Sequence, residues 1–200
     1  MAFLRPSLVL DSTPVLRRSG VLLRPPQMAD YAEWAALRDV SRTHLTPYEP
    51  LWSIDELSRL AFRERVRRSQ RDLREGLGYA FFIVRESDRA LLGGITLSNV
   101  RRGVTEAATV GYWIGVHLTR RGYVSAALGA MAGYAFDDLR LHRLEAACMP
   151  GNLASLRVLE RAGFQREGLA RRYLRINGTW EDHILHALLV EDRPPEGQRP

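Results

Sequence analysis

Short apolar runs alternate along this chain with longer segments in which apolar residues recur every three or four positions. Residues 21–24 are a short apolar run that Pro25 and Pro26 end, a pattern typical of a strand. From residue 30 onward the apolar side chains of Tyr31 and Trp34, with those at 35 and 37, fall on one side of a helix. The pattern therefore predicts a strand followed by a helix.

A second, longer helix is predicted after the loop 44–50, in which two prolines break both periods. Ser53 is followed three residues later by Glu56, the spacing of a capping box. We therefore expect an amphipathic helix that starts at Ser53 and ends before a turn at 73–78.

The middle of the chain has the two-residue period of strands. Three apolar runs, at 79–84, 91–97 and 108–114, are separated by short polar turns. Runs with this spacing predict three antiparallel neighbours in a sheet. A helix over 125–139 is expected next.

The last part of the chain predicts strand, helix and hairpin. Gly163 follows the helix as a C′ glycine, and Asn177-Gly178 is a strong hairpin signal between two strands. The predicted elements are a strand at 143–148, a helix at 152–162 and strands at about 165–175 and 180–189. The order β-α-α-β-β-β-α-β-α-β-β favours an α/β fold with a mixed sheet.

The 200 residues suffice for one domain, which we place at 19–190, after an N-terminal extension at 1–18 and before a disordered, proline-rich tail at 191–200. The single cysteine, Cys148, excludes an intramolecular disulfide and fits a reducing compartment. No apolar run approaches the roughly 18 residues of a membrane span. We therefore expect a cytoplasmic protein without membrane contact.

The net charge is +6, and all 29 basic residues are arginine. A GC-rich genome explains this bias, but it also has a physical consequence, since guanidinium binds phosphate and carboxylate in a fork. The surface should attract phosphorylated cofactors, acidic protein tails or ribosomal RNA.

Residues 119–125 combine features of an anion site. They follow a strand and open a helix, whose N-terminus favours negative charge. Gly122 lets the backbone approach a ligand closely, and Arg120 and Arg121 can bind phosphate oxygens. The alternative is an ordinary strand-to-helix turn with exposed arginines.

Residues 150–164 have the sequence P-G-N-x-x-S-x-R-V-L-E-R-x-G-F, in which Asn152 is a good N-cap. Together with the arginine-glycine loop, this stretch resembles the Gcn5-related N-acetyltransferase (GNAT) family. The resemblance covers about 19–190. It implies a single-domain α/β fold with a mixed, mostly antiparallel sheet of about seven strands and about four helices on its faces.

Four further stretches are similar to the ribosomal-protein-alanine N-acetyltransferase branch. They are 110–114, 141–146, 163–168 and 172–183. The branch implies a protein N-terminus as the partner, most simply the alanine or serine of a ribosomal protein. It implies no nucleic-acid contact except through the ribosome, and a monomer or homodimer.

The resemblance also implies acetyl-CoA as acetyl donor, with no metal. The coenzyme-binding residues that it implies are Ile114, Val116, Arg120, Arg121, Gly122, Tyr123, Val124, Asn152, Ser155 and Arg157. The family loop, Gln/Arg-x-x-Gly-x-Gly/Ala, is altered here, because Thr119 and Val124 stand at its first and last positions. This departure favours weaker coenzyme binding.

The implied reaction is direct attack of a neutral amine on the acetyl thioester, with the oxyanion held by backbone N–H groups of the strand at 108–114. Ser155 would protonate the departing thiolate, or it is only a first-turn capping residue. Acceptor contacts are expected from Tyr48, Trp52, Tyr112 and Tyr173.

The general base is less defined. Glu106 stands only at the entrance of the third strand, and Leu174 precedes the Asn-Gly turn where some relatives carry a glutamate. The candidates that remain are Asp182, Glu181, His183 and Tyr112. Asp182 beside His183 is a candidate catalytic relay, and the alternative is a structural pair on a hairpin strand. A base that acts through ordered water also fits.

Two other functions remain open. One is acetylation of a small amine such as a polyamine or an antibiotic, against which the positive net charge argues. The other is a non-catalytic CoA-binding module. The histidines are scattered without the spacing of metal ligands, and Cys148 is expected to be a buried small hydrophobe.

Overall fold

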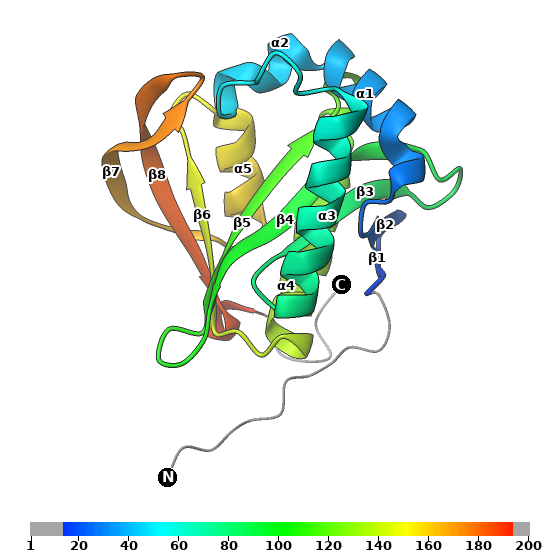
Figure 1. The fold of residues 1–200 in the computed structure, drawn as a ribbon. Helices are drawn as coiled ribbons and strands as arrows, with labels where there is room; N and C mark the ends of the chain where they lie inside the picture. The colour runs from blue at the N-terminus through cyan, green and yellow to red at the C-terminus, as the bar shows by residue number, and fades with distance from the viewer. Residues whose placement is uncertain (1–13, 194–200) are drawn as a thin grey trace.

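The computed structural model describes residues 14–193 (Figure 1). Most of the expected N-terminal extension, residues 1–13, and most of the expected tail, residues 194–200, lie outside the described residues. Within them, no helix is long and apolar enough to cross a membrane.

The described chain forms one eight-stranded mixed sheet in the order β1-β2-β3-β4-β5-β6-β8-β7. Every neighbouring pair is antiparallel except β5 and β6, which are parallel. The predicted mixed, mostly antiparallel sheet is confirmed, with one strand more than expected. The strands are β1 (Leu16–Arg18), β2 (Val21–Arg24), β3 (Tyr79–Arg85), β4 (Leu91–Arg101), β5 (Ala107–Ile114), β6 (Arg143–Cys148), β7 (Gln165–Ile176) and β8 (Thr179–Leu189).

The additional strand is β1, which lies inside the segment assigned to an N-terminal extension. Leu16 pairs with Leu23, and Arg18 pairs with Val21. Ser19 and Gly20, both with positive φ, make the tight turn between the two strands. The sheet therefore begins before residue 19. At the other end, Val190–Asp192 forms a short 3-10 turn within the segment assigned to the tail.

Helices cover both faces of the sheet (Figure 1). The described α-helices number five, one more than expected. They are α1 (Tyr31–Val40), α2 (Arg42–Leu45), α3 (Arg59–Glu75), α4 (Tyr123–Gly133) and α5 (Leu153–Arg161). A π-turn (Tyr134–Asp138) extends α4 to the end of the predicted helix.

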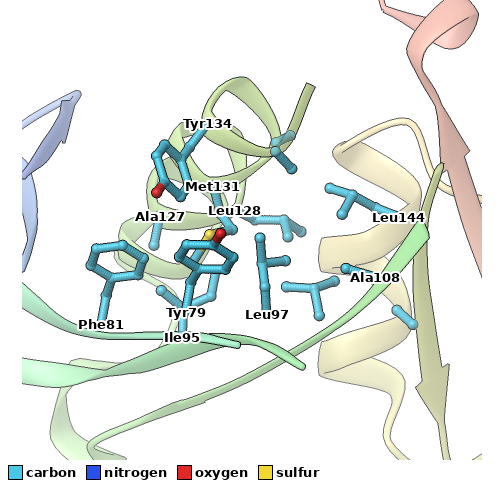
Figure 2. Packing of buried hydrophobic residues seen from close by; sticks show 14 of the residues in the cluster. Tyr79, Phe81, Ile95, Leu97, Ala108, Ala127, Leu128, Met131, Tyr134 and Leu144 are labelled. Carbon is cyan, nitrogen blue, oxygen red and sulfur yellow. The ribbon is translucent and has the colours of Figure 1, made fainter. Parts of the chain in front are cut away.

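Two apolar clusters hold these layers together, because the side chains of β2 and β3 alternate between the faces. Phe81 and Ile83 pack on the side of α4 and α5, while Phe82 and Val84 pack on the side of α1 and α3. Figure 2 shows the larger cluster, with Leu128 and Met131 of α4 directed at the sheet. Burial of both faces makes the sheet a rigid support.

The start of α3 corrects the predicted capping box. Ser53 does not cap a helix; its Oγ donates to Asp55 at 2.7 Å. The N-cap is Ser58, whose side chain accepts from the backbone N–H of Ala61. Glu56 contacts Arg65 at 2.6 Å instead of reaching back to residue 53. The predicted start is therefore wrong by five residues, because Ser58 and not Ser53 supplies the cap.

The hairpin β7–β8 confirms the Asn-Gly signal. Asn177 and Gly178 have φ values of 45° and 85°, as a two-residue turn between twisted strands requires. Its tip contacts the segment after α2, since the N–H of Asn177 donates to the carbonyl of Glu49 at 2.9 Å. The predicted loop at 44–50 thus includes the end of α2 and the 3-10 turn Thr46–Tyr48.

Candidate active site

The central feature of the site is the parting of the two parallel strands. β5 and β6 are paired only at Ala107–Thr109 and Arg143–Glu145. In Figure 1 the two strands rise from a common base and separate toward the top. Beyond the last pair lies a cavity of about 170 Å³. It is lined by Tyr48, Val110, Gly111, Tyr112, Ala146, Ala147, Cys148, Met149, Asn152, Ser155, Leu159 and His183.

A hydroxyl pair crosses one wall of this cavity. The phenol oxygen of Tyr112 on β5 lies 2.7 Å from Oγ of Ser155 on α5. Asn152 fixes the start of α5, because its Oδ1 accepts from the N–H of Ser155 at 3.1 Å. The predicted N-cap is therefore present, and the Ser155 hydroxyl remains available to the cavity.

The electrostatic setting keeps Tyr112 protonated. Burial raises the pKa of Tyr112 to about 12, although the hydrogen bond from Ser155 lowers it in part. The pair is consequently neutral at physiological pH and carries protons that it can donate.

Cys148 and His183 also line the cavity, and the sequence alone did not define a catalytic role for either. Cys148 ends β6, with Sγ 3.6 Å from the carbonyl oxygen of Met149, and burial raises the pKa of its thiol. His183 on β8 is 3% exposed, and its Nδ1 lies 3.0 Å from the carbonyl oxygen of Glu181. A signal for Cys148 was its position at the carboxyl end of a strand, just before the Pro-Gly-Asn motif.

The loop after β5 leads to a helix N-terminus that has no side-chain cap. Gly122 is the N-cap of α4 with φ of 79°, and a Cβ placed on it would meet no atom within 4 Å. Arg120 and Arg121 are exposed beside it. The helix begins at Tyr123, two residues earlier than predicted, so the N–H groups of 123–125 belong to its first turn.

Both helices start at the same edge of the sheet. α4 follows the carboxyl end of β5, and α5 follows the carboxyl end of β6. Because β5 and β6 are parallel, the helix N-termini at Gly122 and Asn152 lie on the side where the strands part. Ligands of α/β sheets bind at such carboxyl edges.

The remaining predicted coenzyme-binding residues differ in their exposure and in whether their groups are already hydrogen-bonded. Ile114 is the last residue of β5 and is partly buried. The N–H of Val116 already donates to Oγ of Ser41 at 3.0 Å. Arg157 is exposed on α5, and no ion pair to it occurs within the described part of the chain.

The outer wall of the cavity is held by a buried ion pair. Arg38 of α1, 5% exposed, binds both carboxylate oxygens of Glu49 at 2.8 and 2.7 Å. The indole of Trp52 donates to Glu49 at 2.7 Å, and its ring lies 4.3 Å from the Arg38 guanidinium. Trp52 therefore supports the segment that carries Tyr48, and it is not among the residues lining the cavity.

The β7–β8 hairpin carries two of the predicted site residues, Asp182 and Tyr173. Oδ1 of Asp182 accepts from the backbone N–H of Arg172 at 2.8 Å, which holds the irregular part of β7. Tyr173 is half-exposed, with its ring 5.9 Å from the ring of His183. Neither Asp182 nor Tyr173 lines the cavity with Ser155.

No three His, Cys, Asp or Glu residues between 14 and 193 are grouped so that they could hold a metal ion. The site is thus built from hydroxyl groups, a thiol, an imidazole and backbone groups at a strand edge and two helix N-termini.

Comparison with known proteins shows which family this chain belongs to. The sequence model described as an acetyltransferase (GNAT) domain matches residues 21–165. The chain belongs to the GNAT acetyltransferase family. The GNAT fold predicted from the sequence is confirmed, as is the expectation that the protein is an N-acetyltransferase.

Two curated GNAT relatives cover most of the chain. "Probable N-acetyltransferase YjcK" of Bacillus subtilis is 35% identical over 89% of this chain and 98% of its own length. The [ribosomal protein uS5]-alanine N-acetyltransferase of Escherichia coli is 32% identical over 78% of this chain and 80% of its own length. The predicted likeness to the ribosomal-protein-alanine branch is therefore confirmed.

A solved GNAT structure has the same fold. Mycobacterium smegmatis RimJ, solved in complex with CoA-disulfide, has a TM-score of 0.85 and 33% identity. The match covers 92% of this chain and 90% of that one.

Proposed function

We propose that this GNAT enzyme transfers the acetyl group of acetyl-CoA to the α-amino group of a protein whose first residue is alanine or serine. The acceptor that fits best is a ribosomal protein in the cytoplasm. The observation that carries the proposal is the Tyr112–Ser155 hydroxyl pair, 2.7 Å apart, at the point where β5 and β6 separate.

The residues at the carboxyl edge of the sheet fit acetyl-CoA, which supplies an activated acetyl thioester when bound. The uncapped first turn of α4 offers N–H groups to an anion, and Gly122 leaves open space in front of them. Arg120, Arg121 and Arg157 add guanidinium groups. We assign the pyrophosphate to this loop and the thiol end to the cavity at Ser155.

The chain's own groups then handle charge and protons. Beyond Thr109 the β5 backbone has no paired partner on β6, so N–H groups on that edge can stabilise negative charge on the acetyl oxygen. The Ser155 hydroxyl, oriented by Tyr112, donates a proton to the sulfur as the carbon–sulfur bond breaks.

An α-amino acceptor suits this cavity better than a lysine side chain. No carboxylate side chain is among the residues lining it. An α-amino group, with a pKa of about 7.7–8.0, is easier to neutralise than a lysine amine by roughly 3 kcal/mol at neutral pH. The E. coli relative that acts on the alanine of ribosomal protein uS5 supports the same choice.

The test compares three acceptors with the purified protein and acetyl-CoA. Peptides with free N-terminal alanine or serine should gain 42 Da at the α-nitrogen, as is usual for one acetyl group; N-blocked lysine peptides and spermidine should react at least about tenfold more slowly. Faster reaction of the lysine peptide or of spermidine would reject the proposed acceptor. Coenzyme binding without transfer to any amine would identify a binding module.

Ser155→Ala tests the proposed proton donor. The turnover number should fall by about tenfold to a hundredfold while the affinity for acetyl-CoA changes much less. An equal loss of affinity in calorimetry would instead make Ser155 a structural cap of α5.

A further inference from the structure

The cavity contains a candidate for the base that takes a proton from the attacking amine. Its titratable lining groups are Tyr48, Tyr112, Cys148 and His183. Burial raises the pKa of Tyr112 and of Cys148, so both remain protonated at neutral pH and cannot accept a proton. Imidazole is the side chain that most often acts as a base near neutral pH.

The hydrogen bond of His183 determines which of its nitrogens is free. Its Nδ1 lies 3.0 Å from the backbone oxygen of Glu181. A carbonyl oxygen can only accept, so Nδ1 carries the hydrogen in this contact. In the neutral ring Nε2 then has the lone pair, and no hydrogen-bond partner of Nε2 occurs among residues 14–193.

The position of His183 places it across the cavity from the proton donor. Ile184 is paired with Cys148, the last residue of β6. His183 therefore lies one residue beyond the end of that pairing, on the β8 side, while Tyr112 belongs to β5 on the other side. His183 and Tyr112, the partner of Ser155, therefore reach the cavity from strands on opposite sides of β6.

From this geometry we propose that Nε2 of His183 accepts the proton of the acceptor amine during acetyl transfer. The inference rests on the proposed function and adds the missing base to it. The amine nitrogen bonds to the acetyl carbon and loses a proton to Nε2, giving imidazolium. The carbon–sulfur bond breaks, and sulfur receives the proton of Ser155. Exchange with solvent then returns the imidazolium proton to the Ser155–Tyr112 pair, so one proton is taken and one is given.

The chain offers a closely matched control in His186. Both histidines are 3% exposed and lie on β8. Both place Nδ1 near the carbonyl oxygen two residues earlier, at 3.0 Å for His183 and 3.3 Å for His186. Only His183 is among the residues that line the cavity. His→Asn keeps an N–H near the Nδ1 position at either site and removes Nε2.

We expect His183→Asn to reduce kcat for an Ala-starting peptide by about a hundredfold at pH 7, with unchanged acetyl-CoA affinity. His186→Asn should stay within about threefold of the wild type. The deficit of His183→Asn should persist with trifluoroethylamine, because even this neutral amine must lose a proton as its nitrogen bonds to the acetyl carbon. His183→Gln is the second variant if the first does not fold.

The pH profile gives an independent readout. Measured with trifluoroethylamine, which is already neutral at pH 7 and adds no limb of its own above that pH, wild-type kcat/KM should rise with pH, and this limb should be absent in His183→Asn. The charged and titratable groups near the ring are Tyr173, Tyr48, Tyr112 and Cys148, with the carboxylates of Glu181 and Asp182 adjacent in sequence. Tyr173→Phe should leave the limb in place.

The outcomes separate this inference from the proposed function. If the wild type acetylates trifluoroethylamine but no peptide, the proposed acceptor is wrong, while the His183 comparison still decides the base. A folded His183→Asn or His183→Gln protein with wild-type kcat and pH limb overturns the inference alone. A wild type that acetylates no amine overturns both.

Discussion

At the scale of single residues, burial determines which groups in the cavity can move a proton. Tyr112 and Ser155 form a neutral pair, because burial disfavours the phenolate of Tyr112 more than the hydrogen bond favours it. His183 is more deeply buried than either, and its Nδ1 lies 3.0 Å from a backbone oxygen. In the mechanism that we propose, the hydroxyl pair therefore donates a proton and the imidazole accepts one.

The raised pKa of Tyr112 predicts loss of stability in alkali. An unfolded tyrosine titrates at about 10, whereas Tyr112 in the fold titrates at about 12. Between these values the unfolded chain binds fewer protons than the native state, so the free energy of unfolding must fall as the pH rises. Urea denaturation from pH 8 to 12 should show this decline, and Tyr112→Phe should reduce its slope. An unchanged slope in Tyr112→Phe would contradict the assignment; the exposed Tyr173→Phe serves as the control.

At the scale of elements, the start of α4 is the feature to which we assign the pyrophosphate of the coenzyme. The backbone of Gly122 has a positive φ, which other residues adopt at a cost. The space in front of it is open, and a side chain there would occupy the path of an anion toward the helix N-terminus.

Gly122→Leu should weaken acetyl-CoA binding by at least about tenfold, because it adds both bulk and backbone strain at the proposed phosphate loop. Isothermal titration calorimetry measures the change. Gly103→Leu is the matched control, since Gly103 has φ of 74° and equally open surroundings but lies in the loop between β4 and β5. Equal affinities for the two variants would move the phosphate site elsewhere.

Elements with strong local signals could be predicted from the sequence, and those fixed by distant contacts could not. Asn177-Gly178 specifies its own turn, and Asn152 caps α5 as expected. The start of α3 was misplaced because Ser58 caps the helix and Glu56 pairs with Arg65, nine residues away, instead of Ser53. Strand β1 was missed because its three residues gain order only by pairing with β2.

The residues of the candidate site also divide into those with a local sequence signal and those brought together by distant contacts. Ser155 and Gly122 could be proposed from the sequence because each belongs to a continuous motif at a helix start. Trp52 was assigned to the acceptor, but its indole is engaged by Glu49. Cavity positions such as Cys148 and His183 come from different strands, and only the pairing of β6 with β8 brings them together.

At the scale of the whole molecule, the Arg38–Glu49 pair connects parts that are distant in the sequence. Arg38 belongs to α1 and is stacked between Trp52 and Trp113, and the carbonyl of Glu49 holds the tip of the β7–β8 hairpin at Asn177. Tyr48, adjacent to Glu49, lines the cavity. This pair therefore links the stability of the fold to the shape of the acceptor wall.

Glu49→Gln should lower the free energy of unfolding by about 2 kcal/mol, because it leaves the buried Arg38 charge with only the longer contact to Glu56, at 3.9 Å. KM for the peptide should rise more than KM for acetyl-CoA, since Tyr48 loses its support. Urea denaturation and steady-state kinetics measure the two effects. The exposed pair Arg42–Asp39 is the control, for which Asp39→Asn should cost less than about 1 kcal/mol. Similar losses in both variants would contradict a special role for Glu49.

The parting of β5 and β6 also has a mechanical consequence. In the described sheet, strands β1–β5 form one block and β6, β8 and β7 another, and three residue pairs between β5 and β6 join the two blocks. A coenzyme bound in the opening, as we propose, would contact both blocks, and a ligand at a hundred times its Kd adds about 2.7 kcal/mol of stability. Resistance of the protein to proteolysis should therefore rise and fall with the supply of acetyl-CoA.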